Sequence, residues 1–179
     1  MERLYGKPLL NQEDIHKRVR DLGHQIAVDY EGKDLIMIGI LKGAYNFFSD
    51  LTRAVMLPVR IDFVIATSYG MATTTSGAVR IISDLTEDIT GKDVLMVDDI
   101  IDSGVTTDFM KKHLLSKRPR SLKTCVLLDK KERRKVAIEA DYAGFSIPNK
   151  YVVGYGLDYQ NKYRNLPYIA VLDVNEAQT

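Results

Sequence analysis

Three aspartates lie close together behind an apolar run near the middle of the chain. Residues 94–107 read VLMVDDIIDSGVTT, so that Asp98 and Asp99 directly follow four apolar residues and Asp102 comes three positions later. Adjacent carboxylates can accept hydrogen bonds from the vicinal hydroxyls of a sugar, directly or through metal-bound water. Mg²⁺ suits such a pair, because it takes few carboxylates, keeps several waters and bridges to phosphate oxygens.

The residues after the third aspartate are suited to a phosphate group. Gly104 allows a tight turn, and a helix is expected over residues 106–117. The free N–H groups at the start of that helix, its dipole and the hydroxyls of Ser103, Thr106 and Thr107 can together bind a phosphate monoester. An ordinary strand–turn–helix junction with a Ser or Thr cap has part of this pattern. The segment as a whole favours a grip on a phosphorylated sugar.

The apolar pattern of the chain predicts the elements that must position this segment. Asn11 is placed to cap a helix that runs to about Tyr30. Continuous apolar runs predict buried strands at residues 35–41, 58–66, 94–97 and 122–128, with a further short strand at 81–85. Helices are expected between them, at residues 45–55 and 106–117. This alternation predicts an α/β fold with a mostly parallel sheet and helices on both of its faces.

The remaining segments differ in composition. Residues 67–80, TSYGMATTTSGAVR, are mostly small and hydroxylated, and we expect them to form a mobile loop. The chain after Asp129 is expected to be irregular, with short pieces at residues 151–153 and 169–172. We therefore expect one domain over residues 1–179, with a core at about 33–130, a small irregular hood from 1–10 and 140–179, and a lid at 67–80.

Polar residues cluster just after the predicted strands. In open parallel sheets, ligands bind beyond the carboxyl ends of the strands. The residues found at these positions are Lys42 and Gly43, Ser68 and Tyr69, Asp98 and Asp99, and Asp129 and Lys130. Their shared position at one edge of the sheet predicts a single ligand-binding rim.

Composition narrows the possible partners. The formal net charge is +1 in 179 residues, which provides no global field for nucleic acid or a membrane surface. No apolar run reaches the roughly 18–20 residues that span a bilayer. The single cysteine, Cys125, is expected to be buried, and a chain without an internal disulfide fits the reducing cytoplasm. The basic run KKERRK at residues 130–135 is interpreted, apart from Lys130, as a solvated turn or a subunit contact.

Two other phosphate-handling architectures share part of the pattern. An apolar strand that ends in Asp-Asp is typical of a Walker B element, but no Gly-Lys pair in the sequence is followed by the Ser or Thr of a Walker A loop. A response-regulator receiver also uses an acidic pair, but places it at its first strand, whereas the pair here follows the third. Both architectures are therefore disfavoured.

Residues 94–107 resemble the 5-phosphoribosyl-1-pyrophosphate (PRPP) motif of the type I phosphoribosyltransferases. Within that family the chain is most similar to the hypoxanthine-guanine phosphoribosyltransferases, from about Leu35 to Leu172. The shared motifs are GILKGA, TSYG, VDDIIDSGVT, LLDK and IPNKYVVGYGLDYQNKYRNLP, in the expected order. The resemblance implies the phosphoribosyltransferase fold and a purine salvage enzyme. Such an enzyme transfers the phosphoribosyl group from PRPP to N9 of hypoxanthine, and of guanine, and releases pyrophosphate.

The resemblance also implies roles for individual residues in the PRPP site. Asp98 and Asp99 would hold the ribose hydroxyls, partly through Mg²⁺. The 5′-phosphate would be bound by Ser103, Gly104, Val105, Thr106 and Thr107. The pyrophosphate would be bound by Lys42, Gly43 and Arg164, in a loop where the family often has a cis peptide between Leu41 and Lys42.

For the purine, the resemblance implies that Asp102 is the general base near N7 and that Lys130 donates to the 6-oxo group. Tyr151 would stack on the base, and Val152 would offer backbone hydrogen bonds. Asp158 would lie at the purine site and ligate a second Mg²⁺. A lid over the site would contain Ser68 and Tyr69.

The resemblance leaves alternatives open. A regulator with the same fold would keep a PRPP site, but such regulators tend to lack an Asp at the position of Asp102, and a repressor would need a DNA-binding domain. The alternative bases are xanthine and a pyrimidine, because Lys130 suits any 6-oxo acceptor and disfavours only the 6-amino group of adenine. Many relatives have Glu at the position of Asp98 and Phe at that of Tyr151. Relatives are dimers or tetramers, so the resemblance predicts a homodimer or homotetramer.

Overall fold

The structure is a computed structural model that describes residues 4–68 and 79–172. Its main sheet, as far as these residues show it, contains β2 (Leu35–Leu41), β3 (Arg60–Ser68), β4 (Val79–Ser83), β5 (Asp93–Ile101), β6 (Ser121–Asp129) and β7 (Tyr142–Ser146). The strand order is β4-β3-β2-β5-β6-β7. All neighbouring pairs are parallel except β3 and β4, which are antiparallel. The prediction of a mostly parallel α/β sheet is confirmed.

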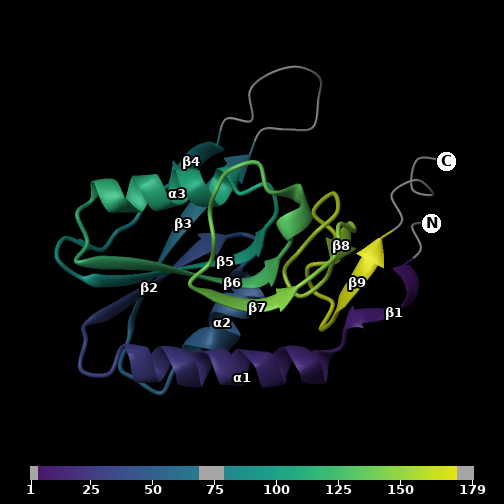
Figure 1. The fold of residues 1–179 in the computed structure, drawn as a ribbon, viewed down its shortest axis with the longest axis horizontal. Coiled ribbons are helices and arrows are strands. Elements are labelled where there is room, and N and C mark those ends of the chain that lie inside the picture. The colour runs from purple at the N-terminus through teal and green to yellow at the C-terminus, as the bar shows by residue number, and fades with distance from the viewer. Residues whose placement is uncertain (1–3, 69–78, 173–179) are drawn as a thin grey trace.

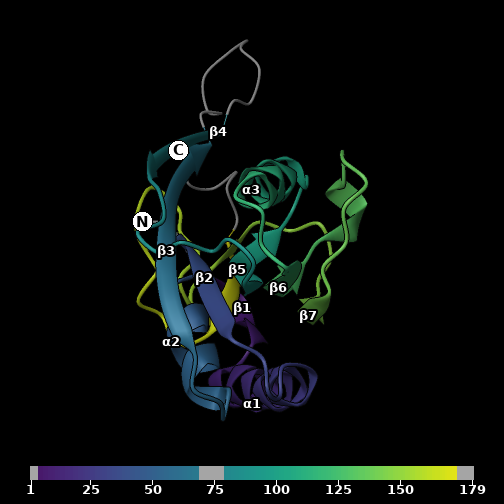
Figure 2. The ribbon, with the colours of Figure 1, turned by 90° about the vertical axis from the view of Figure 1, so that its left-hand side faces the viewer.

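Helices cover both faces of this sheet. Helices α1 (Gln12–Asp29) and α2 (Tyr45–Ala54) lie on one face, and α3 (Val105–Ser116) lies on the other (Figures 1 and 2). Alternate residues of a strand point to opposite faces, so each strand supplies two separate cores. In β2, Leu35 and Met37 pack with α1 and α2, whereas Ile36 and Ile38 pack in the cluster that contains residues of α3. A strand buried on both faces needs the continuous apolar run that predicted it.

Helix α1 begins after Asn11 and ends before Tyr30, as the sequence predicted. The side chain of Asn11 accepts a hydrogen bond from the backbone N–H of Asp14 at 2.9 Å, and Tyr30 is the C-cap residue. Among the described residues, no helix is long and apolar enough to cross a membrane. Cys125 is fully buried in β6, as expected, and burial raises the pKa of its thiol far above the ordinary value.

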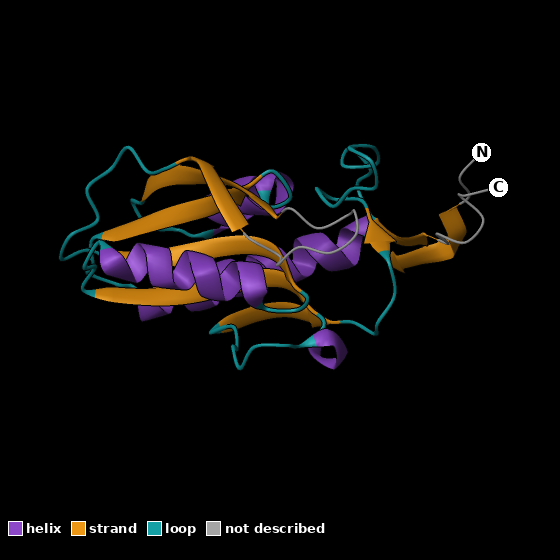
Figure 3. Cartoon of the chain, turned by 90° about the horizontal axis from the view of Figure 1, so that it is seen from above, coloured by secondary structure: helices purple, strands orange, loops and turns teal. Residues whose placement is uncertain are grey.

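A second, smaller sheet joins distant parts of the chain. It contains β1 (Leu4–Leu10), β9 (Ile169–Leu172) and β8 (Val152–Val153), all antiparallel. Seen from above, this sheet lies at one end of the main sheet (Figure 3). It is the small lobe expected from the two ends of the sequence.

Three details of the main sheet differ from the sequence-based expectation. Strand β5 does not end at Val97 but continues to Ile101, because its later residues still pair with β6, so Asp98 and Asp99 lie within the strand. Strand β7 was missed, because YAGFS is a short, half-buried edge segment without an apolar run. Strand β4 starts at Val79 rather than Ile81 and pairs with β3. The expected mobile loop is thus strand at both of its ends, and its residues 69–78 lie outside the described part of the chain.

Candidate active site

Two cavities adjoin at the carboxyl ends of the parallel strands, in the part of the chain that the structure describes. One has a volume of about 290 Å³ and is lined on one side by the segment around Tyr151. The other has a volume of about 270 Å³ and is lined by the start of α3 and by the loop after β2. The residues common to both are Asp99, Ile100, Asp102 and Asp158. A ligand with two parts could place one part in each cavity, and the bond between the two parts would then lie next to Asp102.

The second cavity contains the start of α3. Gly104 is the N-cap residue, with φ of 84°, and no described side chain caps the helix. The nearest contact is a long one of 3.4 Å, from the N–H of Val105 to the hydroxyl of Ser103. The first N–H groups of a helix have no partner within the helix, so an anion can bind them here. Ser103, Gly104, Thr106 and Thr107 line this cavity, whereas Val105 can contribute only through its backbone.

Asp98 and Asp99 reach the same cavity from β5. Asp98 is 6% exposed, and one of its carboxylate oxygens accepts a hydrogen bond from the N–H of Asp99 at 3.0 Å. Burial raises the pKa of the Asp98 carboxyl well above its ordinary value, and the neighbouring charge of Asp99 adds to the effect. Burial raises the pKa of Asp99 as well. A buried carboxylate beside a half-buried one, as here, is stabilised when a cation or sugar hydroxyls approach the pair.

The loop after β2 is held close to Asp99. The peptide between Leu41 and Lys42 is cis. A Cβ atom built on Gly43 would lie 1.8 Å from Oδ2 of Asp99, and one built on Gly156 would lie 2.0 Å from the carbonyl oxygen of Gly43. Only glycines fit these two positions without movement of their neighbours. Lys42 and Gly43 therefore lie at the cavity wall, as the sequence analysis predicted for this rim.

Arg164 enters the second cavity from the smaller lobe. Its guanidinium donates to the carbonyl of Gly156 at 2.7 Å and lies 2.6 Å from a carboxylate oxygen of Asp158. Its own carbonyl accepts hydrogen bonds from the side chains of Tyr45 and Asn46 in α2, both at 3.1 Å. These contacts fix Arg164 at the edge of the cavity.

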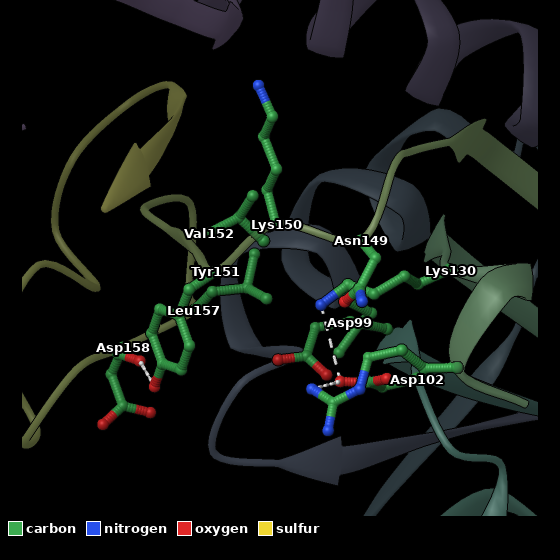
Figure 4. A pocket seen from close by; sticks show the side chains of 11 residues that line it. Asp99, Asp102, Lys130, Asn149, Lys150, Tyr151, Val152, Leu157 and Asp158 are labelled. Carbon is green, nitrogen blue, oxygen red and sulfur yellow. Dashed lines mark hydrogen bonds and ion pairs between the residues drawn. The ribbon is translucent and has the colours of Figure 1, made fainter. Parts of the chain in front are cut away.

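The first cavity brings together the residues predicted for a purine. Lys130, Tyr151, Val152 and Asp158 all line it. Lys130 is 4% exposed, and in Figure 4 its side chain reaches toward Asp102. The hydroxyl of Tyr151 donates to the carbonyl of Asp158 at 3.2 Å, and the residue is 42% exposed, so part of its side chain is left for a ligand.

Asp102 lies between the two cavities, and its two carboxylate oxygens have different surroundings. Its Oδ2 atom is 3.4 Å from Nζ of Lys130 and 3.3 Å from a guanidinium nitrogen of Arg133. Its Oδ1 atom is buried and has no hydrogen-bond partner among the described residues. A buried carboxylate oxygen without a partner is costly. Because the Asp102 side chain is 34% exposed although Oδ1 is buried, the part of Asp102 that a ligand can reach in this conformation is not Oδ1.

The basic run KKERRK is not a simple solvated turn. It forms η1 (Lys131–Arg133), and Lys130, Arg133 and Arg134 all contact Asp102, through its side chain or its backbone. The interpretation as a solvated turn is wrong for Arg134, whose side chain is 13% exposed, because the turn folds back over the loop that follows β5. Arg133 remains half exposed to solvent.

A metal site made by protein alone is absent from residues 4–68 and 79–172, where no three His, Cys, Asp or Glu side chains gather. The Asp98–Asp99 pair fits a cation that takes its other ligands from water and substrate, as Mg²⁺ does. Asp158 is already engaged, since it pairs with Arg164 and accepts from the N–H of Asn161 at 2.8 Å.

The remaining site residues are those predicted for the lid and those that the sequence analysis did not predict. Ser68 ends β3, where it pairs with Val79, and Tyr69 lies outside the described residues, so the lid stays a prediction. Of the residues that line the first cavity, the sequence analysis missed five, which are Ile100, Arg133, Asn149, Lys150 and Leu157. Three of them stand in the motif around Tyr151, Ile100 stands between Asp99 and Asp102, and Arg133 stands three positions after Lys130, so proximity to these motifs was the signal available.

Comparisons with known proteins agree with this geometry. A model of the family described as phosphoribosyl transferase domain matches residues 7–160. The hypoxanthine-guanine phosphoribosyltransferase of Mycobacterium tuberculosis is 48% identical over 171 residues, covering 92% of this chain and 85% of the relative. The chain belongs to the hypoxanthine-guanine phosphoribosyltransferase family. The phosphoribosyltransferase of the same name from Aquifex aeolicus is 45% identical and covers 97% of this chain and 99% of its own.

Solved phosphoribosyltransferases share the fold. A hypoxanthine phosphoribosyltransferase from Staphylococcus aureus superposes with a TM-score of 0.92 at 45% identity, covering 98% of this chain and 95% of the other. A ternary substrates complex of the Trypanosoma cruzi enzyme has a TM-score of 0.87 at 41% identity, with 94% and 96% covered. The likeness therefore extends over the whole phosphoribosyltransferase fold, including the smaller lobe.

Proposed function

We propose that the two cavities together transfer the 5-phosphoribosyl group from PRPP to N9 of hypoxanthine, and of guanine, with release of pyrophosphate. As a hypoxanthine-guanine phosphoribosyltransferase the chain is a purine salvage enzyme, and the proposal concerns how its two cavities divide the reaction. The observation that carries the proposal is the place of Asp102 in the lining of both cavities, where they adjoin. A general base must come within hydrogen-bond reach of the proton that it accepts, and a purine in the first cavity would bring its N7 proton to this carboxylate.

The second cavity would hold PRPP. The uncapped start of α3 would bind the 5′-phosphate, and Asp98 and Asp99 would accept hydrogen bonds from the ribose hydroxyls. Lys42 and Arg164, at the far edge of this cavity, would bind the pyrophosphate. Their positive charges would stabilise the negative charge that develops on the leaving group.

Mg²⁺ would be held by the carboxylates of Asp98 and Asp99 and would supply further neutralisation of the leaving pyrophosphate. For Asp158 to hold a second Mg²⁺, Arg164 would have to release its carboxylate, as it would on binding pyrophosphate. The ion pair between Arg164 and Asp158 supports such an exchange, in which Arg164 would turn to pyrophosphate and Asp158 to Mg²⁺.

The first cavity would hold the purine. The carboxylate of Asp102 would accept the proton of N7, or share it, as N9 attacks C1′ of the ribose and pyrophosphate leaves. Lys130 would donate to the 6-oxo group, and the ring of Tyr151 would stack on the base. The backbone of Val152 would donate and accept at the remaining edge. Adenine is disfavoured, because its 6-amino group would meet the ammonium of Lys130 with two donors facing each other.

The partners proposed are PRPP and an oxopurine, with neither nucleic acid nor membrane. We also propose that the chain acts in the cytoplasm, as a homodimer or homotetramer, and that Ser68 and Tyr69 belong to a lid that excludes water. Exclusion of water would protect PRPP from hydrolysis during transfer. The family membership and the buried single thiol of Cys125 support these expectations.

A steady-state assay tests the function. Pyrophosphate release is measured with PRPP, Mg²⁺ and, in separate reactions, hypoxanthine, guanine, xanthine or adenine. We expect release with hypoxanthine and guanine and little or none with adenine. PRPP binding without release in the presence of any base would favour a regulator with the same fold and would contradict the proposal.

A further inference from the structure

The turn formed by residues 130–135 is fastened to the loop that carries Asp102. Three consecutive carbonyl groups, those of residues 101–103, accept hydrogen bonds from this turn. The donors are the N–H groups of Lys130 and Lys135, at 2.9 and 2.8 Å, and the guanidinium of Arg134, at 3.1 Å. The backbone of Asp102 is therefore fixed by hydrogen bonds at its own carbonyl and at the carbonyls of the residues before and after it. The donors lie about thirty residues further along the sequence.

The same turn also holds the side chain of Asp102, but only at one oxygen. Arg133 and Lys130 approach Oδ2, at 3.3 and 3.4 Å, whereas Oδ1 is buried without a partner among the described residues. The terminal torsion of an Asp side chain is broad, so the backbone contacts alone do not decide which way the carboxylate turns. The two cations decide it, since both lie on the Oδ2 side.

Lys130 cannot fix the orientation of the Asp102 carboxylate alone if it also binds the purine. Its ammonium has three N–H donors and a single flexible stem, and it is expected to donate to the 6-oxo group. A second cation at Oδ2 keeps the carboxylate oriented while Lys130 turns toward the base. Arg133 is that second cation, and its planar guanidinium offers a more directional hydrogen bond than an ammonium does.

Arg133 is better placed for Asp102 than for a phosphate. It lines the cavity around Tyr151 and not the cavity at the start of α3. Its side chain is half exposed, so it can be replaced without opening a hole in the core. A direct contact with the 5′-phosphate or the pyrophosphate would require it to leave Asp102.

We infer that Arg133 is a positioning residue, whose guanidinium holds Oδ2 of Asp102 and so keeps the carboxylate in one orientation at the junction of the two cavities. The inference rests on the proposed function, because it concerns the same reaction. Arg133 also lines the first cavity, but its contact in this structure is with Asp102, through which it would act. Its removal should thus affect turnover with the purine and leave the binding of PRPP intact.

The first experiment compares Arg133→Gln, Arg133→Lys and Lys131→Gln with the wild type in the steady-state assay with hypoxanthine. Lys131 is the matched control, since it belongs to the same turn, is 62% exposed and contacts Glu139 rather than Asp102. We expect Arg133→Gln to lower kcat about tenfold, a fraction of what a general base contributes. KM for PRPP should stay within about twofold, Arg133→Lys should recover part of kcat, and Lys131→Gln should match the wild type.

A double-mutant cycle separates positioning of Asp102 from every other role. In the Asp102→Asn background, Arg133→Gln should change kcat by less than about twofold, because the carboxylate it orients is gone. A full tenfold loss in that background, an unchanged kcat in the single variant, or a raised KM for PRPP at unchanged kcat would each overturn the inference. A wild type that releases no pyrophosphate would instead contradict the proposed function, so the two failures are distinguishable.

Discussion

Gly43 and Asp99 approach each other so closely that a Cβ atom on Gly43 would lie 1.8 Å from Oδ2 of Asp99. The loop after β2 and the strand β5 meet at this point, although 56 positions separate the two residues (99 − 43). On its other side the loop is bounded by Gly156, whose Cβ would lie 2.0 Å from the carbonyl oxygen of Gly43. The loop proposed to bind pyrophosphate thus lies between Asp99, which is proposed to bind the ribose, and the smaller lobe.

A methyl group on Gly43 should therefore damage the PRPP site. In Gly43→Ala the new Cβ must displace the loop or the Asp99 carboxylate, and a misplacement of about 1 Å can cost about 100-fold. We expect kcat/KM for PRPP to fall by about 10- to 100-fold. Steady-state kinetics with varied PRPP measures this, and unchanged kinetics would show that the loop accepts the methyl group without consequence.

Tyr151 should contribute through its ring more than through its hydroxyl. Stacking of a base on an aromatic side chain is worth about 1–3 kcal/mol, so Tyr151→Ala should raise KM for hypoxanthine by about 5- to 150-fold. Tyr151→Phe keeps the ring and removes only the hydrogen bond to the carbonyl of Asp158. Its KM should remain within about fivefold of the wild type. Equal losses in both variants would argue that the hydroxyl, and not stacking, binds the base.

Asp84 should stabilise the fold in a pH-dependent way. Burial opposes its ionisation, but the ammonium of Lys117, the ring of His113 and the N–H of Leu85 outweigh burial and lower the pKa of Asp84 to about 2. A lowered pKa means that the stabilisation is present above the unfolded value, 3.8, and is lost as the pH falls toward 2.

Asp84→Asn should accordingly lower Tm at pH 7 by at most about 2–4 °C, since partly exposed pairs contribute up to about 1 kcal/mol. The gap to the wild type should narrow as the pH is lowered from 4. Thermal melts over this range measure it, with Asp21→Asn as the control, because Asp21 forms an exposed ion pair with Lys17 one turn away on α1, and such pairs contribute little to stability. A gap that widens below pH 4 would contradict the assignment.

Apolar runs predicted the main sheet well, because a strand buried on both faces must be apolar throughout, as β2 is. Strand β7 could not be predicted in this way, because it is a half-buried edge strand and its sequence YAGFS has no continuous apolar run. The end of β5 was misjudged for a related reason. Asp98 and Asp99 interrupt the apolar run, but their backbone continues the ladder with β6.

The candidate site was predictable where its residues share a motif. Asp98, Asp99 and Asp102 stand in one segment, and the helix after them follows from the sequence. The contacts of Asp102 were not predictable, since Arg133 comes from a turn that composition alone assigned to solvent. Charge in a short basic run does not indicate which carboxylate will pair with it. That information lies in how β5 and β6 are placed side by side.

The replacement of Asp102 by Asn tests the account most directly. Asn keeps the size of the side chain and removes its capacity to accept a proton. We expect kcat with hypoxanthine to fall by about 100- to 10,000-fold, while the dissociation constant of PRPP, measured by titration calorimetry, stays within about threefold. Turnover equal to that of the wild type would contradict the assignment of Asp102 as the base at the junction of the two cavities.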